Sequence, residues 1–181
     1  CDAVAYAHSR GVIHRDLKPE NIMVGEFGEV LVMDWGLAKP IQQEERTRAI
    51  RSNRRDGAEQ VTLQGEVFGT PAFMPPEQAR GDIAALDHRA DIYSLGATLY
   101  AILTNALPVT GKSTERLLEN VARGRLVPPS QRSKRPVARE LEAVVLKAMA
   151  LKPRDRYPSV RALREEIVAY LDGRTLSAAD Y

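Results

Sequence analysis

The sequence has little of what marks several classes of protein. Among its 181 residues there is one cysteine, Cys1, which excludes an internal disulfide framework and a cysteine-based zinc site. Aromatic residues make up only 6% of the chain, and 26 basic side chains against 24 acidic ones leave a formal net charge of +2. A dedicated nucleic-acid-binding protein usually carries a strong basic excess, so we expect no nucleic acid among the partners.

Long hydrophobic runs are also scarce. Residues 1–15 lack the cationic start and apolar run of a signal peptide. The stretch 92–111 has no charged residue, but polar residues and Pro108 interrupt it, and its dense apolar part ends at Leu103. An apolar run of that length is typical of a buried core helix rather than a membrane span. We therefore expect a central buried helix, no membrane contact from this segment and a cytoplasmic location.

The remaining composition, 44% hydrophobic and 28% charged, is that of a soluble globular protein. Apolar periodicity, together with glycine and proline signals, predicts a mainly α fold with one small β-hairpin. An exposed, mobile segment is expected from Pro40 to Glu66, and prolines 128, 129 and 136 mark a connection. A first helix is expected to end near residue 9, strands at 22–24 and 30–33, and further helices at 76–80, 88–105, 114–122, 137–150 and 158–171.

The informative chemistry lies in residues 14–21, which read HRDLKPEN, and in Asp34, which follows thirteen residues later. Asp16 can accept the proton of an attacking hydroxyl, and Lys18 can neutralise charge on a transferring phosphoryl group. Asn21 and Asp34 offer the oxygen ligands that Mg²⁺ prefers, and the hairpin between them would return both to one side of a cleft. These are the parts that phosphoryl transfer needs.

This loop resembles the catalytic loop of protein kinases, with Asp34-Trp35-Gly36 in the place of the kinase D-F-G motif. Four later features also resemble kinase motifs in the same order, and together they extend the resemblance to about Leu171. They are Gly69-Thr70-Pro71 and Pro75-Pro76-Glu77 at the end of an activation segment, Asp91 to Gly96 at the start of the buried central helix, and Arg156 as the arginine that pairs with Glu77.

The resemblance implies a serine/threonine protein kinase of the bacterial, eukaryotic-like (Hanks) type. Lys18 is typical of the serine/threonine class, and residues 76–81, PEQARG, are similar to the bacterial members. ATP and Mg²⁺ are then the implied cofactors, and a protein with a serine or threonine acceptor is the implied partner. By the same analogy Thr70 lies near Asp16 and helps to select the acceptor, Met23 lies under the adenine ring, and Asp91 braces the backbone of the catalytic loop.

Departures from the family pattern set the expected domain organisation. Trp35 replaces the usual phenylalanine, and a larger ring can still stack on His14, which we interpret as a packing residue. The 181 residues contain no Gly-rich loop, no strand lysine for the phosphates and no partner glutamate. We therefore expect residues 1–172 to form a kinase C-terminal lobe with activation segment 34–77 and tail 173–181. We also expect that these residues lack the N-terminal lobe and that this fragment is inactive alone.

Other interpretations stay open at this stage. A pseudokinase-like docking module and a small-molecule phosphotransferase are the alternatives to a protein kinase, and the intact Asp16 and Asp34 argue against the first. For the intact protein, a kinase dimer and a membrane tether are further expectations.

Individual residues also carry interpretations. Thr62 is the predicted phosphorylation site, where a phosphate could pair with Arg15. We interpret His8 and His88 as surface or capping residues, because neither has a partner at metal-ligand spacing.

Overall fold

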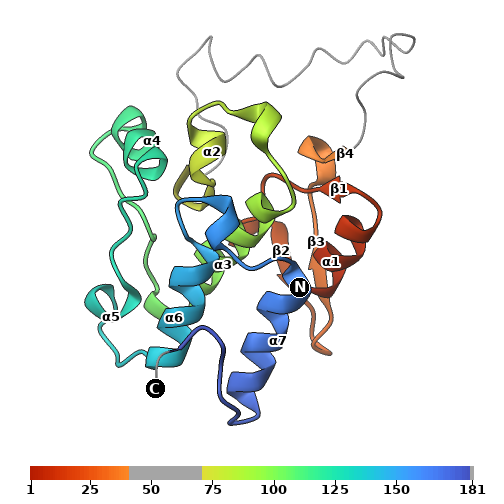
Figure 1. Cartoon of the computed structure of the whole chain (residues 1–181), viewed down its shortest axis with the longest axis vertical. Coiled ribbons are helices and arrows are strands. Elements are labelled where there is room, and N and C mark those ends of the chain that lie inside the picture. The colour runs from red at the N-terminus through yellow and green to blue at the C-terminus, as the bar shows by residue number, and fades with distance from the viewer. Residues whose placement is uncertain (41–70, 180–181) are drawn as a thin grey trace.

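The computed structural model describes residues 1–40 and 71–179. Most of the segment expected to be exposed, together with Thr62 and Thr70, lies outside the described residues. The described part is mainly helical, with two small antiparallel sheets (Figure 1). Its helices are α1 (Asp2–Ser9), α2 (Pro76–Ala79), α3 (Arg89–Thr104), α4 (Thr114–Ala122), α5 (Pro129–Arg132), α6 (Arg139–Ala148) and α7 (Val160–Leu171), joined by short 3₁₀ turns.

The two sheets are both formed by short strands. Strand β2 (Ile22–Val24) pairs with β3 (Val30–Val32), so that Met23 lies opposite Leu31, and this is the hairpin expected from the sequence. Strand β1 (Val12–Ile13) pairs with β4 (Lys39–Pro40), which the sequence analysis did not predict. Two-residue strands carry almost no alternation, so no periodic signal marks them.

Helix α3 is the centre of the fold and packs against α6, α7 and α5 (Figure 1). Its two sides contribute to two separate hydrophobic clusters. Ile92 belongs to a cluster with Leu17, Val144 and Leu163, whereas Tyr93 and other α3 residues pack with Phe73 and Met149. The uncharged stretch is therefore a buried core helix, as expected, and no helix within the described ranges is both long and apolar enough to cross a membrane.

The helix ends follow local rules that the sequence carries. The side chains of Ser113 and Ser159 accept hydrogen bonds from the backbone N–H groups of Arg116 and Ala162, and they begin α4 and α7. Asn105 has a φ of 50° and ends α3 in the left-handed conformation. By contrast, the sequence analysis expected only a connection at the prolines near residue 129. In the structure Pro129 is the first residue of the short helix α5, and the first turn of a helix tolerates proline.

The residues set apart as a tail after 172 pack onto the helices. Leu176 is only 5% exposed and belongs to the same cluster as Ile92. Glu166 on α7 accepts hydrogen bonds from the backbone N–H groups of Ser177 and Ala178. A single buried leucine in a polar segment gives no periodic signal, so this packing is visible only in the structure.

Helices α3 and α6 approach each other closely at Gly96. A Cβ atom built on Gly96 would lie 2.7 Å from the Cβ of Ala148 and 3.0 Å from the Cγ of Met149. Glycine therefore stands inside the helix because this interface has no room for a methyl group, and the close contact offsets the entropic cost of glycine in a helix.

Replacing Gly96 with alanine is expected to lower the free energy of unfolding by about 1–3 kcal/mol, because the added methyl group overpacks the interface. Urea denaturation measures this loss. The double variant Gly96→Ala/Ala148→Gly removes the closest of the clashing atoms, so its destabilisation should be smaller than the sum of the two single changes. Strict additivity of the two changes would contradict the proposed contact.

Candidate active site

One buried carboxylate on α3 holds the backbone of the 14–18 loop. Asp91 is 0% exposed, and its two oxygens accept hydrogen bonds from the backbone N–H groups of His14 (2.8 Å) and Arg15 (2.9 Å). Arg15 has a φ of 70°, in the left-handed region that residues with a Cβ rarely occupy. The two charge-assisted hydrogen bonds offset the cost of that conformation, so the shape of the loop depends on α3.

His8 is a third partner of the same carboxylate. Its Nε2 lies 2.7 Å from Oδ2 of Asp91, and its ring packs edge-on to that of His88, with centroids 5.8 Å apart. The interpretation of His8 as a surface or capping residue is therefore wrong. Residues 8 and 91 are far apart in the chain, and no local pattern links a histidine on one helix with a carboxylate on another.

His14 is fully buried and uses both ring nitrogens within the fold. Its Nδ1 accepts a hydrogen bond from the backbone N–H of Asp16 (3.3 Å), which leaves Nε2–H to donate to the carbonyl oxygen of Met33 (2.9 Å). The ring lies 4.6 Å from that of Trp35 at an interplanar angle of 56°. His14 thus packs against Trp35, in a tilted rather than a parallel arrangement.

Asp16, Lys18 and Asn21 form a compact polar cluster on the loop. Nζ of Lys18 lies 3.0 Å from Oδ2 of Asp16, and Nδ2 of Asn21 donates to the same oxygen at 3.2 Å and to the backbone oxygen of Asp16 at 2.8 Å. The side chains of Asp16 and Lys18 remain 26% and 16% exposed. The carboxylate is therefore fixed in position but still accessible to a hydroxyl group from outside.

The β2–β3 hairpin brings Asp34 to the same end as Asn21. The backbone N–H of Met33 donates to the carbonyl oxygen of Asn21 (2.9 Å), directly before Asp34. Asp34 is exposed, has a φ of 57° and accepts a weak hydrogen bond from the N–H of Gly36 (3.4 Å). The structure thus places an amide and a carboxylate at one edge of the hairpin.

A magnesium ion needs few protein ligands when phosphates and waters complete its coordination shell, so these two oxygen-bearing groups fit that ion. In the ranges 1–40 and 71–179, no three residues of histidine, cysteine, aspartate or glutamate are grouped as a metal cage.

Two further predicted site residues lie beside the cluster. Met23 is 50% exposed on β2, next to other exposed apolar side chains of the hairpin. Arg15 donates from Nε to the carbonyl oxygen of Leu37 at 2.5 Å. Burial lowers the pKa of Arg15 below its usual value, while the charge of Asp91 opposes that shift.

The expected pair of Arg156 and Glu77 is present as a bidentate, buried ion pair. Nη1 and Nη2 of Arg156 lie 2.7 and 2.8 Å from the two carboxylate oxygens of Glu77. The remaining donors of the guanidinium reach the carbonyl oxygens of Ala150 (2.9 Å) and Arg89 (3.0 Å), and the group also lies 5.0 Å from the centre of the Tyr93 ring. This pair joins α2 to the turn before α7.

Sequence reasoning missed two contacts, one that ties α2 to the loop and one that ties α3 to Phe73. Nε2 of Gln78 on α2 donates to the carbonyl oxygen of Arg15 (3.2 Å), and the hydroxyl of Ser94 on α3 donates to the carbonyl oxygen of Phe73 (2.9 Å). Gln78 stands within the PEQARG stretch, so its position could have drawn attention to it, although its partner could not have been predicted.

Comparisons with known proteins agree with this arrangement. The sequence pattern described as "Protein kinase domain" matches residues 1–168. The chain is 43% identical over 178 residues to serine/threonine-protein kinase PknD of Protochlamydia amoebophila, covering 97% of this chain and 18% of that protein. It is 39% identical over 173 residues to serine/threonine-protein kinase PknB of Mycobacterium tuberculosis, covering 96% of this chain and 25% of that protein.

A mainly helical fold built around a buried helix, with an Asp-Lys-Asn loop braced by that helix, defines the kinase class of phosphoryl-transfer proteins. Since the family pattern covers residues 1–168, the chain belongs to the protein kinase domain family. Its compared relatives are bacterial serine/threonine kinases, and the chain spans about a fifth to a quarter of their length.

Proposed function

We propose that this chain is the C-terminal lobe of a serine/threonine protein kinase, which transfers the γ-phosphoryl group of ATP to a hydroxyl group of a protein. The observation that carries the proposal is the cluster of Asp16, Lys18 and Asn21 on a loop braced by Asp91. Each of these side chains has a different task in phosphoryl transfer, and a docking module would need none of them in this arrangement.

The carboxylate of Asp16 orients the acceptor hydroxyl and takes its proton. Lys18, 3.0 Å from that carboxylate, supplies a fixed positive charge beside the phosphoryl group in transit. Lys18 lies beside Asp16 in the absence of substrate, so its positive charge is in place before the reaction begins. The hydrogen bonds from Asn21 hold Asp16 in one rotamer, so its position does not have to be selected during the reaction.

The amide oxygen of Asn21 and the carboxylate of Asp34 are the groups that would hold Mg²⁺. The Nδ2 group of Asn21 already donates its hydrogen bonds to Asp16, so the Oδ1 atom of Asn21 is the one that would bind a cation. When bound, the ion neutralises charge on the phosphates of ATP. Met23, exposed on β2, would supply the apolar floor for the adenine ring, and Thr70, outside the described residues, is the proposed contact for the acceptor.

Nucleotide binding and activity are proposed for the longer polypeptide rather than for these residues alone. The 181 residues contain no Gly-rich loop and no strand lysine, which in protein kinases cover the phosphates. The exposed apolar side chains of the hairpin are consistent with a second layer of protein over this edge. The phosphorylation of Thr62, with Arg15 as its partner, remains part of this proposal.

The test compares two polypeptides in the presence of γ-labelled ATP, magnesium and a serine- and threonine-containing protein mixture. The longest natural polypeptide that carries this chain is expected to label serine and threonine, and chelation of magnesium should abolish the labelling. The isolated chain should give no label above background. Labelling confined to tyrosine, or magnesium-independent transfer, would contradict the proposal.

A further inference from the structure

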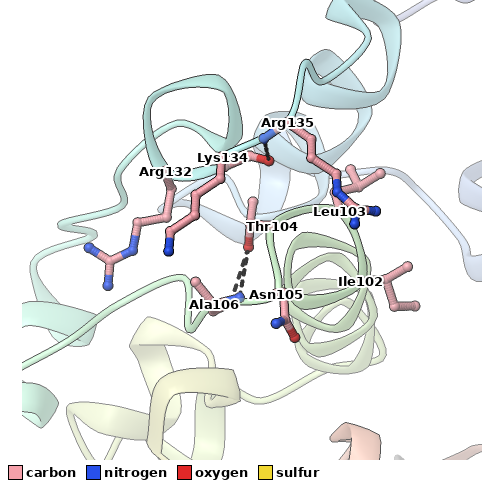
Figure 2. Close-up of a pocket in the computed structure, with 9 residues that line it drawn as sticks. Ile102, Leu103, Thr104, Asn105, Ala106, Arg132, Lys134 and Arg135 are labelled. Carbon is pink, nitrogen blue, oxygen red and sulfur yellow. Dashed lines mark hydrogen bonds between the residues drawn. The ribbon is translucent and has the colours of Figure 1, made fainter.

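A basic pocket lies between the end of α3 and the segment after α5. Its cavity volume is about 730 Å³. Arg132, Lys134 and Arg135 line one wall, and no acidic residue is among the residues that line the pocket. In Figure 2 Thr104 lies between Lys134 and Arg135, and the side chain of Arg132 extends to the other side of Lys134, farther from α3. The proposed kinase chemistry uses none of these residues.

The three cations have no acidic partner within the described ranges. All three are exposed, and no side-chain hydrogen bond or ion pair of theirs is formed there, whereas Arg116 and Arg123 of the α4 region both pair with Glu119. Cations near a helix C-terminus also interact favourably with the helix dipole. That interaction alone needs no concave wall and does not neutralise three charges, so a ligand of negative charge is favoured here.

The opposite wall of the pocket is apolar. Ile102, on the last turn of α3, is 73% exposed, and Leu103 and Ala106 also line the pocket. The turn that carries the cations is held by a hydrogen bond from the backbone N–H of Arg135 to the Ser133 hydroxyl (3.1 Å). A ligand that fits both walls must combine an apolar side chain with a compact anionic group.

We propose that this pocket binds a phosphorylated peptide segment of a partner protein. Arginine and lysine pair well with phosphate, and a guanidinium group can donate two hydrogen bonds to it. A lipid-binding site usually needs about 4–8 cations on an open surface. A single-stranded nucleic acid needs aromatic rings for stacking, and no aromatic residue lines this pocket.

The test measures binding of two fluorescein-labelled peptide pools to the 181-residue chain without nucleotide, by fluorescence polarisation. Both pools are random except for one central residue, which is phosphoserine in the first pool and serine in the second. The phosphoserine pool should bind about tenfold or more tightly than the serine pool. The triple variant Arg132→Ala/Lys134→Ala/Arg135→Ala should lose this difference. Since all three side chains are exposed, its thermal unfolding should match that of the parent chain.

The matched control is Lys112→Ala/Lys152→Ala/Arg161→Ala, which removes three other exposed cations and changes the net charge equally. It should keep the preference for phosphoserine. Equal loss in both triple variants, or no preference in the parent chain, would overturn the proposal. So would tighter binding of phosphatidylserine vesicles or oligonucleotides through the same three cations. Because no nucleotide is present, the outcome does not depend on the proposed kinase activity.

Discussion

Replacing Arg156 with methionine is expected to lower the free energy of unfolding by about 3–5 kcal/mol. The side chain of Arg156 is 0% exposed and that of Glu77 is 4% exposed, so the change leaves a buried carboxylate without its partner. The backbone oxygens of Ala150 and Arg89 lose their donors as well. A loss of this size is a large part of the 5–15 kcal/mol that stabilises a typical domain. Urea denaturation monitored by circular dichroism measures it.

Two controls separate the ion pair from a general loss of charge. Arg154→Met removes a neighbouring arginine whose side chain is 73% exposed and whose contact with Asp155 is long, at 3.8 Å, so it should change stability by about 0.5 kcal/mol at most. Arg156→Lys keeps the charge but loses the bidentate geometry, and it should give an intermediate loss. If methionine at position 156 proved as stable as arginine, the pair would have no role in holding α2.

Replacing Asp16 with asparagine is expected to reduce phosphoryl transfer by about 10²–10⁴-fold in the longest polypeptide that carries this chain. The substitution keeps the shape of the side chain but removes the carboxylate that we propose accepts the proton. Because the side chain of Asp16 is 26% exposed and is not a proposed nucleotide ligand, kcat should fall while KM for ATP stays nearly constant.

The matched control is Asp82→Asn, which removes an exposed carboxylate that pairs only with Arg80 in the described structure. Its kcat should equal that of the parent. If Asp16→Asn retained transfer within a few-fold of the parent, the assignment of Asp16 as the base would fall. If KM for ATP rose with kcat unchanged, Asp16 would serve binding rather than chemistry.

The elements with strong local signals were predictable from the sequence. The central helix α3, the hairpin and the amphipathic helices α4, α6 and α7 follow from periodicity and from caps such as Ser113 and Ser159, which act within a few residues. The separation of Asn21 and Asp34 by a hairpin also predicted that they come together, because a hairpin returns the chain to its starting edge. Proline at the start of α5 and the two-residue strands gave no such signal.

Sequence by itself determined which chemical groups this protein carries and their order along the chain: HRDLKPEN, then Asp34, then Glu77, Asp91 and Arg156. Only the tertiary structure decided which residues from distant parts of the chain are in contact. The carboxylate of Asp91 joins His8 and Arg15, Gln78 reaches the loop, and three cations line a pocket at the end of α3 with no acidic residue among its described lining. These contacts depend on how helices pack, and packing is set by the shapes of many side chains together, whereas local patterns report only each helix's own buried face.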